Sequence, residues 1–173
     1  YIVTAKIGEL TDSLDLNGNI LETQKNISIE KKDIEIAIKK LGDKYFQIPP
    51  VYSALKYQGN PLYKLARNKK MDLEQLEEIV KTKSREVQIE KIEITDFSFP
   101  FFTFKTTVSK GTYIRSLAND IAKQINLNAT TYKLERTKIG NLKLENATNI
   151  DKLKNIQEIE KALLNPNNIK EEI

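Results

Sequence analysis

Residues Ser109 to Arg115 join the end of a predicted strand to the start of a predicted helix through a glycine turn. Apolar side chains recur at helical spacing over residues 112–126, which places Arg115 in the first turn. A cation there opposes the helix dipole by roughly 0.3–1 kcal/mol. A negative partner, either a carboxylate or a phosphate, would explain this arginine. The alternative, on spacing alone, is an exposed arginine on a solvated helix face.

A second segment interleaves aromatic and basic side chains. Its members are Tyr52, Lys56, Tyr57, Tyr63, Lys64 and Arg67. Such a composition suits RNA, because cations contact phosphates while aromatic rings stack on bases. The alternative is a surface loop whose tyrosines pack beneath it.

Asp12 and Asp15 form a third candidate, within the sequence TDSLDLNG. Paired carboxylates can bind a metal or share a proton. Aspartate is also a standard turn residue, and the neighbouring Asn and Gly residues favour that interpretation here. We therefore interpret both aspartates as turn residues.

The composition limits the available chemistry. The chain of 173 residues has a formal net charge of +4 and contains neither cysteine nor histidine. Common structural zinc sites and nucleophiles activated by histidine are thereby excluded, so chemistry must rest on carboxylates, cations, tyrosines or hydroxyls. A mild basic excess is compatible with a polyanionic partner. No apolar run is long enough to span a membrane, and we expect a cytoplasmic protein.

Hydrophobic periodicity predicts the elements that position these residues. Helices are expected at 30–41, 62–67, 73–81, 112–126 and, more weakly, 156–164. Strands are expected at 1–8, 85–97, 101–109 and about 130–142. The remaining part of 45–70 reads as a loop, because prolines and glycine interrupt it.

The order of these elements predicts the fold class. A shift of the apolar phase between Ile89 and Ile92 indicates a bulge, and the strand that contains it should pair antiparallel with 101–109. There is no regular alternation of strand and helix. We therefore expect an α+β fold with a mainly antiparallel mixed sheet flanked by helices.

Four segments together resemble the TruB family of tRNA pseudouridine synthases, and they occur in the family's order. They are YIVTAKIG with TDSLDLNG, then IPPVYSALKYQGNPLYKLAR, then VSKGTYIRSLANDIA, and finally the segment from Ala129 to Gly140. The two middle motifs are long and specific. The resemblance covers about residues 1–150 and implies an incomplete pseudouridine synthase catalytic domain.

The resemblance also implies a domain organisation. Residues 1–150 would form the partial catalytic domain, with a thumb-like insertion at about 47–85 whose 69–83 segment is longer than the family pattern. Residues 151–173 would be a helical extension or the start of a small C-terminal domain. The family's nucleophilic aspartate lies in a G-x-L-D-P loop, which is absent from this sequence. We therefore expect this aspartate outside the chain, and the chain alone to be inactive.

Roles for single residues follow from the same resemblance, which implies isomerisation of a T-loop uridine (uridine 55) of tRNA by base flipping. Tyr1 would stack on the flipped base near the proton that leaves carbon 5. Arg115 would pair with the nucleophilic aspartate and, in this chain alone, would bind an anion or turn to solvent. Tyr113 and Leu134 would line the uracil pocket. The RNA contacts would come from Tyr52, Lys56, Tyr63, Arg67 and Lys110.

The expected partner is the T-arm of tRNA, bound by a monomer that needs no other protein, no metal and no organic cofactor. Two alternatives remain open. One is an RNA-binding α+β module without chemistry, and the other is an interaction protein that binds a second protein through the tyrosine-rich segment. Binding that weakens steeply with salt would favour RNA over protein.

Overall fold

The computed structural model describes residues 1–68 and 70–163. The chain divides into two compact units, of which the larger is Ile2–Leu134. The second unit combines Tyr1 with the residues from Glu135 onward. The candidate site residues belong to the larger unit, with the exception of Tyr1.

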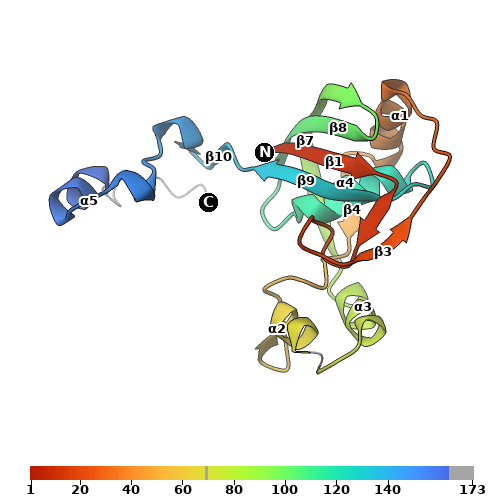
Figure 1. The fold of residues 1–173 in the computed structure, drawn as a ribbon, viewed down its shortest axis with the longest axis horizontal. Helices are drawn as coiled ribbons and strands as arrows, with labels where there is room; N and C mark the ends of the chain where they lie inside the picture. The colour runs from red at the N-terminus through yellow and green to blue at the C-terminus, as the bar shows by residue number, and fades with distance from the viewer. Residues whose placement is uncertain (69, 164–173) are drawn as a thin grey trace. The chain divides into compact units, whose positions relative to one another are not determined.

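A five-stranded sheet forms the centre of the larger unit, with strand order β4-β7-β8-β1-β9 (Figure 1). The strands are β1 (Ile2–Ile7), β4 (Lys44–Gln47), β7 (Arg85–Ser98), β8 (Phe101–Val108) and β9 (Ala129–Glu135). The β4–β7, β7–β8 and β1–β8 pairs are antiparallel. This arrangement confirms the predicted α+β fold with a mainly antiparallel sheet.

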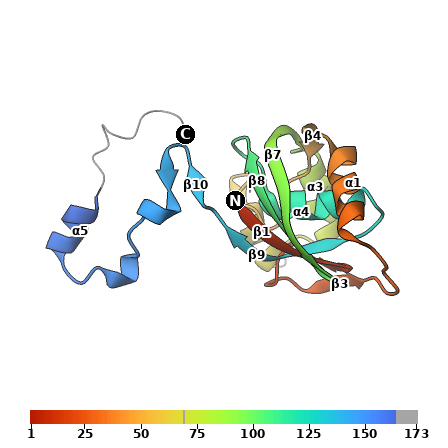
Figure 2. The same cartoon turned by 90° about the horizontal axis from the view of Figure 1, so that it is seen from above.

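One face of the sheet carries the main core. Val3, Ala5 and Ile7 of β1 are buried, as their alternation predicts, and they lie beside buried Phe102 and Phe104 of β8. Helices α1 (Lys31–Leu41) and α4 (Ile114–Lys123) pack against each other, and α4 also contacts β1 (Figure 2). The apolar stripe of α4 is buried in this layer.

The bulge predicted in β7 is confirmed. The β7–β8 register shifts between Ile89 and Lys91, and it shifts a second time between Ile94 and Asp96, which was not predicted. The strand nevertheless continues to Ser98, because the pairing resumes beyond each irregularity.

Several short elements were not predicted. Strand β4 lies in the region interpreted as a loop, and two small hairpins flank the candidate site. These hairpins are β2 (Glu9–Thr11) with β3 (Ile20–Thr23), and β5 (Lys56–Tyr57) with β6 (Asn60–Pro61). Helix α4 is shorter than the predicted range of 112–126, because Tyr113 before it is extended and residues 124–126 after it form a turn.

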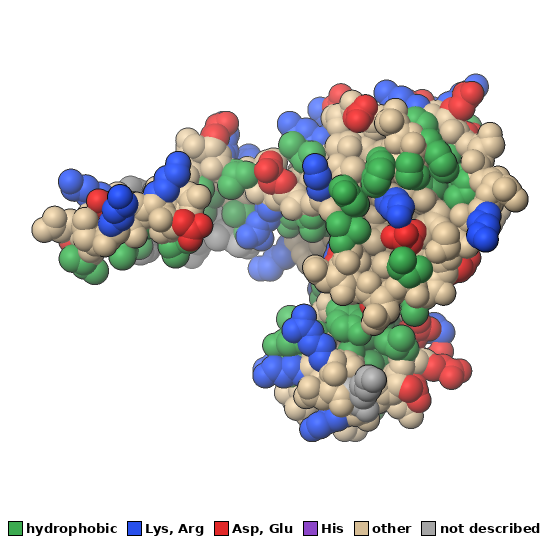
Figure 3. All heavy atoms as spheres, in the orientation of Figure 1, with side chains coloured by type: hydrophobic (Ala, Val, Ile, Leu, Met, Phe, Trp, Pro, Cys, Tyr) green, Lys and Arg blue, Asp and Glu red, His purple; other side chains and the backbone are tan. Residues whose placement is uncertain are grey.

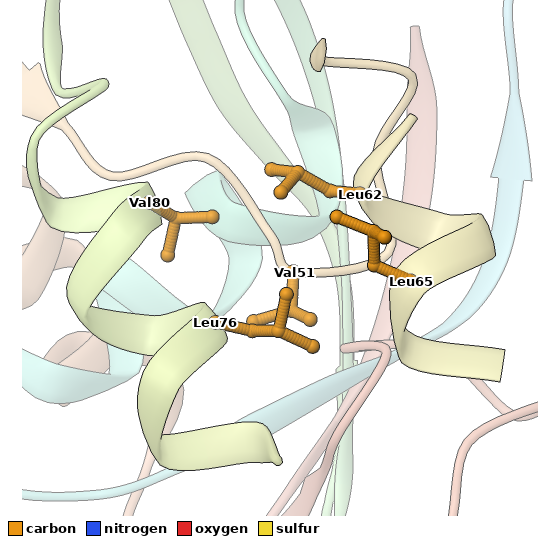
Figure 4. Packing of buried hydrophobic residues seen from close by; sticks show 5 residues of the cluster. All are labelled: Val51, Leu62, Leu65, Leu76 and Val80. Atoms are coloured by element: carbon orange, nitrogen blue, oxygen red, sulfur yellow. The ribbon is translucent and has the colours of Figure 1, made fainter. Parts of the chain in front are cut away.

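Residues 48–84, called the insertion below, connect β4 to β7 and contain α2 (Leu62–Arg67) and α3 (Leu73–Lys81), both as predicted. The two helices share a small apolar core (Figure 4). Its buried members are Val51, Leu62, Leu65, Leu76 and Val80. The long 69–83 segment thus supplies two of these five residues, Leu76 and Val80. Lys69 itself lies outside the described residues.

Leu76→Ala is expected to unfold the insertion without unfolding the sheet. Leu76 is fully buried, and such truncations cost about 2–5 kcal/mol, which is large for so small a core. Hydrogen exchange should accelerate over α2 and α3 and stay unchanged in β8. Glu77→Ala, at an exposed position of the same helix, is the matched control. Equal acceleration in the sheet would show that the insertion and the sheet fold as one cooperative unit.

The smaller unit contains short elements after Leu134. They are β10 (Lys138–Ile139), β11 (Leu142–Lys143), two 3-10 turns at Leu144–Asn146 and Ile150–Lys152, and α5 (Ile156–Ala162). The predicted strand at 130–142 is therefore interrupted after Glu135. The predicted helix at 156–164 is present up to Ala162, and residues 164–173 lie outside the described part of the chain. None of the helices in the described ranges is both long and apolar enough to cross a bilayer.

Candidate active site

Arg115 connects three parts of the larger unit. It lies in the first turn of α4, and its Nη1 is 3.0 Å from Oδ2 of Asp15. The same nitrogen donates to the carbonyl oxygen of Ser13, and Nη2 donates to the carbonyl oxygen of Tyr52 at 2.8 Å. A planar guanidinium with donors in fixed directions suits this arrangement. The 11–19 turn and the root of the insertion therefore meet at one side chain.

Arg115 has the negatively charged partner that its position at the helix start predicts, and it does not turn to solvent. Its partner is Asp15, which was expected to be a turn residue only. Asp15 has both roles, because Oδ1 accepts from Ser13 Oγ at 2.7 Å and from the Asn17 amide at 2.9 Å, while Oδ2 faces Arg115. A hydrogen bond from the Thr131 amide to Leu14 holds the turn against β9.

Asp12 occupies the other side of the same turn. It accepts from the amide and the side chain of Asn19, at 3.0 and 3.1 Å, and from the hydroxyl of Tyr52 at 3.3 Å. Burial raises the pKa of this Tyr52 hydroxyl, and the nearby Asp12 charge raises it further. Gly18 is required here, because a Cβ would overlap the Asp12 and Ser13 side chains. The turn is thus a fixed support for the Asp15–Arg115 pair.

A cleft of about 580 Å³ lies over this pair. The predicted site residues that line it are Tyr52, Tyr63, Arg67 and Arg115, together with Asp12 and Asp15. The structure therefore brings the tyrosine-rich segment and Arg115 to one cavity. The predicted residues Lys56, Lys110, Tyr113 and Leu134 are not among its lining residues.

The insertion presents a basic side and an acidic side. Lys and Arg side chains gather over α2, and acidic side chains gather over α3 (Figure 3). The guanidinium of Arg67 lies 5.9 Å from the ring centre of Tyr63, one helical turn away. Tyr52 and Tyr57 pack partly against the apolar core of the insertion, so the alternative interpretation of buried tyrosines holds in part for these two.

Tyr113 lies just before α4, and Arg85 stacks on it. The Arg85 guanidinium is 5.2 Å from the ring centre, and its Nη2 donates to the carbonyl of Gly111. Gly111 has φ +85°, and a Cβ there would be 2.8 Å from the guanidinium carbon. Leu134, at the end of β9, is 46% exposed. Arg85 was missed from the sequence, where it reads only as the first residue of a strand.

Between β4 and α4, the side chains of Tyr45, Gln47 and Asp120 form a polar cluster in which Gln47 is buried and the other two are half-buried. The Tyr45 hydroxyl donates to Asp120 Oδ2 at 3.0 Å, and the Gln47 amide donates to the Tyr45 oxygen at 2.7 Å. Burial raises the pKa of Asp120 from 3.8 to about 6, although hydrogen bonds and the charge of Lys123 oppose this shift. Burial also raises the pKa of Tyr45, and the Asp120 charge adds to that effect.

The raised pKa of Asp120 predicts a specific pH dependence of stability. The folded state holds a proton that the unfolded state releases, so this contribution to stability is lost as pH rises from about 4 to about 6. The free energy of unfolding should change by up to about 3 kcal/mol through this group. Asp120→Asn should remove that change. The free energy of unfolding of the variant, relative to that of the natural protein, should therefore be higher at pH 8 than at pH 4. Denaturant unfolding at both values measures the difference, and equal differences would contradict it.

Comparison with solved structures defines the class of fold. A chain in the crystal structure of a Cbf5-Nop10-Gar1 complex superposes with a TM-score of 0.56 and 18% identity, over 87% of this chain and 33% of that one. The two chains therefore share their fold.

Sequence comparison defines the family. The model for the TruB family pseudouridylate synthase N-terminal domain matches residues 1–114, so the chain belongs to the TruB family. The tRNA pseudouridine synthase B of Clostridium tetani is 38% identical in an alignment of 169 residues that covers 94% of this chain and 56% of that protein. The protein of the same name from Francisella tularensis subsp. holarctica is 40% identical over 157 residues, 90% of this chain and 49% of that one. The chain thus spans about half the length of these curated relatives.

Proposed function

We propose that the protein isomerises a T-loop uridine of tRNA, uridine 55, to pseudouridine. The observation that carries this proposal is the cleft in which Arg115, paired with Asp15, lies below the tyrosine-rich, basic side of the insertion. Membership of the TruB family supports the reaction class. The monomeric state, the cytoplasmic location and the absence of metal and organic cofactors belong to the proposal.

The proposed reaction conserves all atoms. The bond between N1 and C1′ of the uridine breaks, the freed base turns, and a bond forms between C5 and C1′. The proton on C5 leaves, and N1 gains one. In the proposal an aspartate from outside these 173 residues is the nucleophile. Arg115 keeps that carboxylate ionised and oriented, because an adjacent guanidinium favours the charged form of an acid.

The aromatic residues supply what base flipping requires. A flipped base loses its stacking, at a cost of a few kcal/mol, and an aromatic wall returns part of it. We assign this stacking to Tyr1, with Tyr113 and Leu134 lining the uracil pocket. Tyr1 belongs to the smaller unit, so its role rests on the family motif alone.

The charge distribution of the insertion supports an orientation for tRNA. The basic side over α2 would face the T-arm, with Tyr52, Tyr63 and Arg67 at the cleft and Lys56 and Lys110 outside it. The acidic side over α3 would face away, because it repels phosphates. The insertion would thus act as a thumb on the RNA.

Tritium release tests the proposed function. The protein as its gene encodes it is incubated with tRNA that carries tritium on carbon 5 of uridine, and about one T-loop tritium per tRNA should be released. The 173 residues alone should release none. Binding that weakens steeply with salt but leaves the label intact would instead support an RNA-binding module without chemistry. An upstream sequence without an aspartate loop would favour that alternative for the whole protein.

A further inference from the structure

The side chain of Gln47 forms hydrogen bonds with both the backbone amide and the backbone carbonyl of Tyr113. Gln47 ends β4 and is 1% exposed. Its Oε1 accepts from the amide of Tyr113 at 2.7 Å, and its Nε2 donates to the carbonyl of the same residue at 3.1 Å. The second hydrogen of Nε2 reaches the hydroxyl of Tyr45. All the hydrogen-bonding capacity of Nε2 is therefore used.

Tyr113 is the N-cap residue of α4, and no side chain of its own caps the helix. Its carbonyl oxygen also accepts the first hydrogen bond of the helix, from the Leu117 amide at 2.9 Å. The Ser116 hydroxyl donates to the carbonyl of Ile48 at 3.0 Å, beside Gln47 in the chain. The start of α4 is thus fixed to the end of β4 rather than by a local capping side chain.

Arg115 follows Tyr113 by two residues. Its guanidinium must reach Asp15 and the carbonyl of Tyr52 at the same time, from the first turn of α4. Displacement of a reacting constellation by about 1 Å can lower turnover about a hundredfold. We propose that Gln47 is a positioning residue, which sets the start of α4 and through it the place of the Arg115 guanidinium; this inference rests on the proposed function.

The alternative is that Gln47 only satisfies buried polar groups. Tyr45 offers a matched control, because Tyr45→Phe removes one hydrogen bond of Gln47 but leaves both bonds to Tyr113. Gln47→Leu removes the bonds to Tyr113 as well. If Gln47 positions Arg115, the two variants must differ in turnover even where their stabilities are similar.

Kinetics of the gene product give the first test. For Gln47→Leu, kcat for tritium release should fall about 10- to 100-fold, while KM for tRNA changes less than about threefold. Tyr45→Phe should keep kcat within about threefold of the natural protein. An unchanged kcat in Gln47→Leu, or equal losses in the two variants, would overturn the proposal.

Gln47→Glu adds a readout that a structural defect would not give. A protonated glutamic acid can accept from the Tyr113 amide and donate to its carbonyl, whereas the ionised form has no hydrogen to donate. Asp120 and the Tyr45 hydroxyl face this position, and the cations near the network are Lys123 and Arg85. Relative to the natural protein, kcat should therefore fall as pH rises. If the ratio of kcat in Gln47→Glu to kcat in the natural protein stays constant with pH, the proposed role of the hydrogen bonds to Tyr113 is contradicted.

Hydrogen exchange separates this proposal from the proposed function. In Gln47→Leu the amide of Tyr113 loses its acceptor, so the peptide spanning 111–116 should exchange faster, with no change in Tyr45→Phe. If the natural protein releases no tritium, the proposed function fails, yet the exchange measurement still decides whether Gln47 holds the start of α4. If exchange of the 111–116 peptide is unchanged in Gln47→Leu, the inference is wrong whatever the activity of the protein.

Discussion

Arg115→Ala is expected to lower kcat for pseudouridine formation by at least about a hundredfold, the cost of removing one preorganised electrostatic group. The guanidinium contacts Asp15 and the carbonyls of Ser13 and Tyr52 at the same time. An adjacent cation is also what keeps a nucleophilic carboxylate charged in a dry pocket. Affinity for tRNA should fall less than about tenfold, because a single cation contributes little to binding at a large RNA interface. Single-turnover tritium release and equilibrium binding measure the two effects.

Arg115→Lys is the control for charge. It keeps the cation but loses the planar fork, so it cannot donate to Asp15, Ser13 and Tyr52 in their present directions. Most of the loss should therefore persist. Equal losses of turnover and affinity in Arg115→Ala would show that Arg115 contacts a phosphate instead. Thermal unfolding of both variants separates these effects from loss of the folded state.

Asp15→Asn should have the second largest effect, with kcat lowered about 10- to 100-fold. An asparagine can still accept from Ser13 and the Asn17 amide, so the turn keeps its hydrogen bonds. Its amide nitrogen would face the guanidinium of Arg115, however, and two donors repel each other. Arg115 would then lose its charge partner and its fixed orientation.

Asp12→Asn is the matched control, since Asp12 lies in the same turn and contacts Tyr52 and Asn19 but not Arg115. Its kcat should stay within about threefold of the natural protein. Single-turnover rates at saturating tRNA compare the two variants directly. If both aspartates matter equally, the turn as a whole, and not the ion pair, supports the reaction.

The long elements could be predicted from the sequence because their periodicity is regular, as in β1 and α4. Strand β4 could not, because its pattern is inverted. Phe46 is 71% exposed while Gln47 is 1% exposed, so an apolar residue points outward and a polar one inward. A strand whose buried position holds a polar residue does not show the apolar alternation by which strands are predicted. It can be recognised only when the partners of that polar residue are known.

Arg115 could be predicted because a cation at a helix start is locally unfavourable and requires an explanation. Its partner could not, since Asp15 lies 100 positions away in a turn where aspartate is ordinary. Gln47 and Arg85 were missed for a related reason. Their contacts with the turn at 111–113 depend on strand pairing that brings distant segments together.

The two ends of the insertion meet at one point of the sheet. Gln47, which precedes it, pairs in register with Arg85, which follows it, and both side chains contact the turn at 111–113. A displacement of the insertion by a bound RNA would therefore reach the turn at 111–113 through this pair, and Arg115 through the carbonyl of Tyr52. The attachment of the insertion would thus be mechanically coupled to the start of α4, where Arg115 lies.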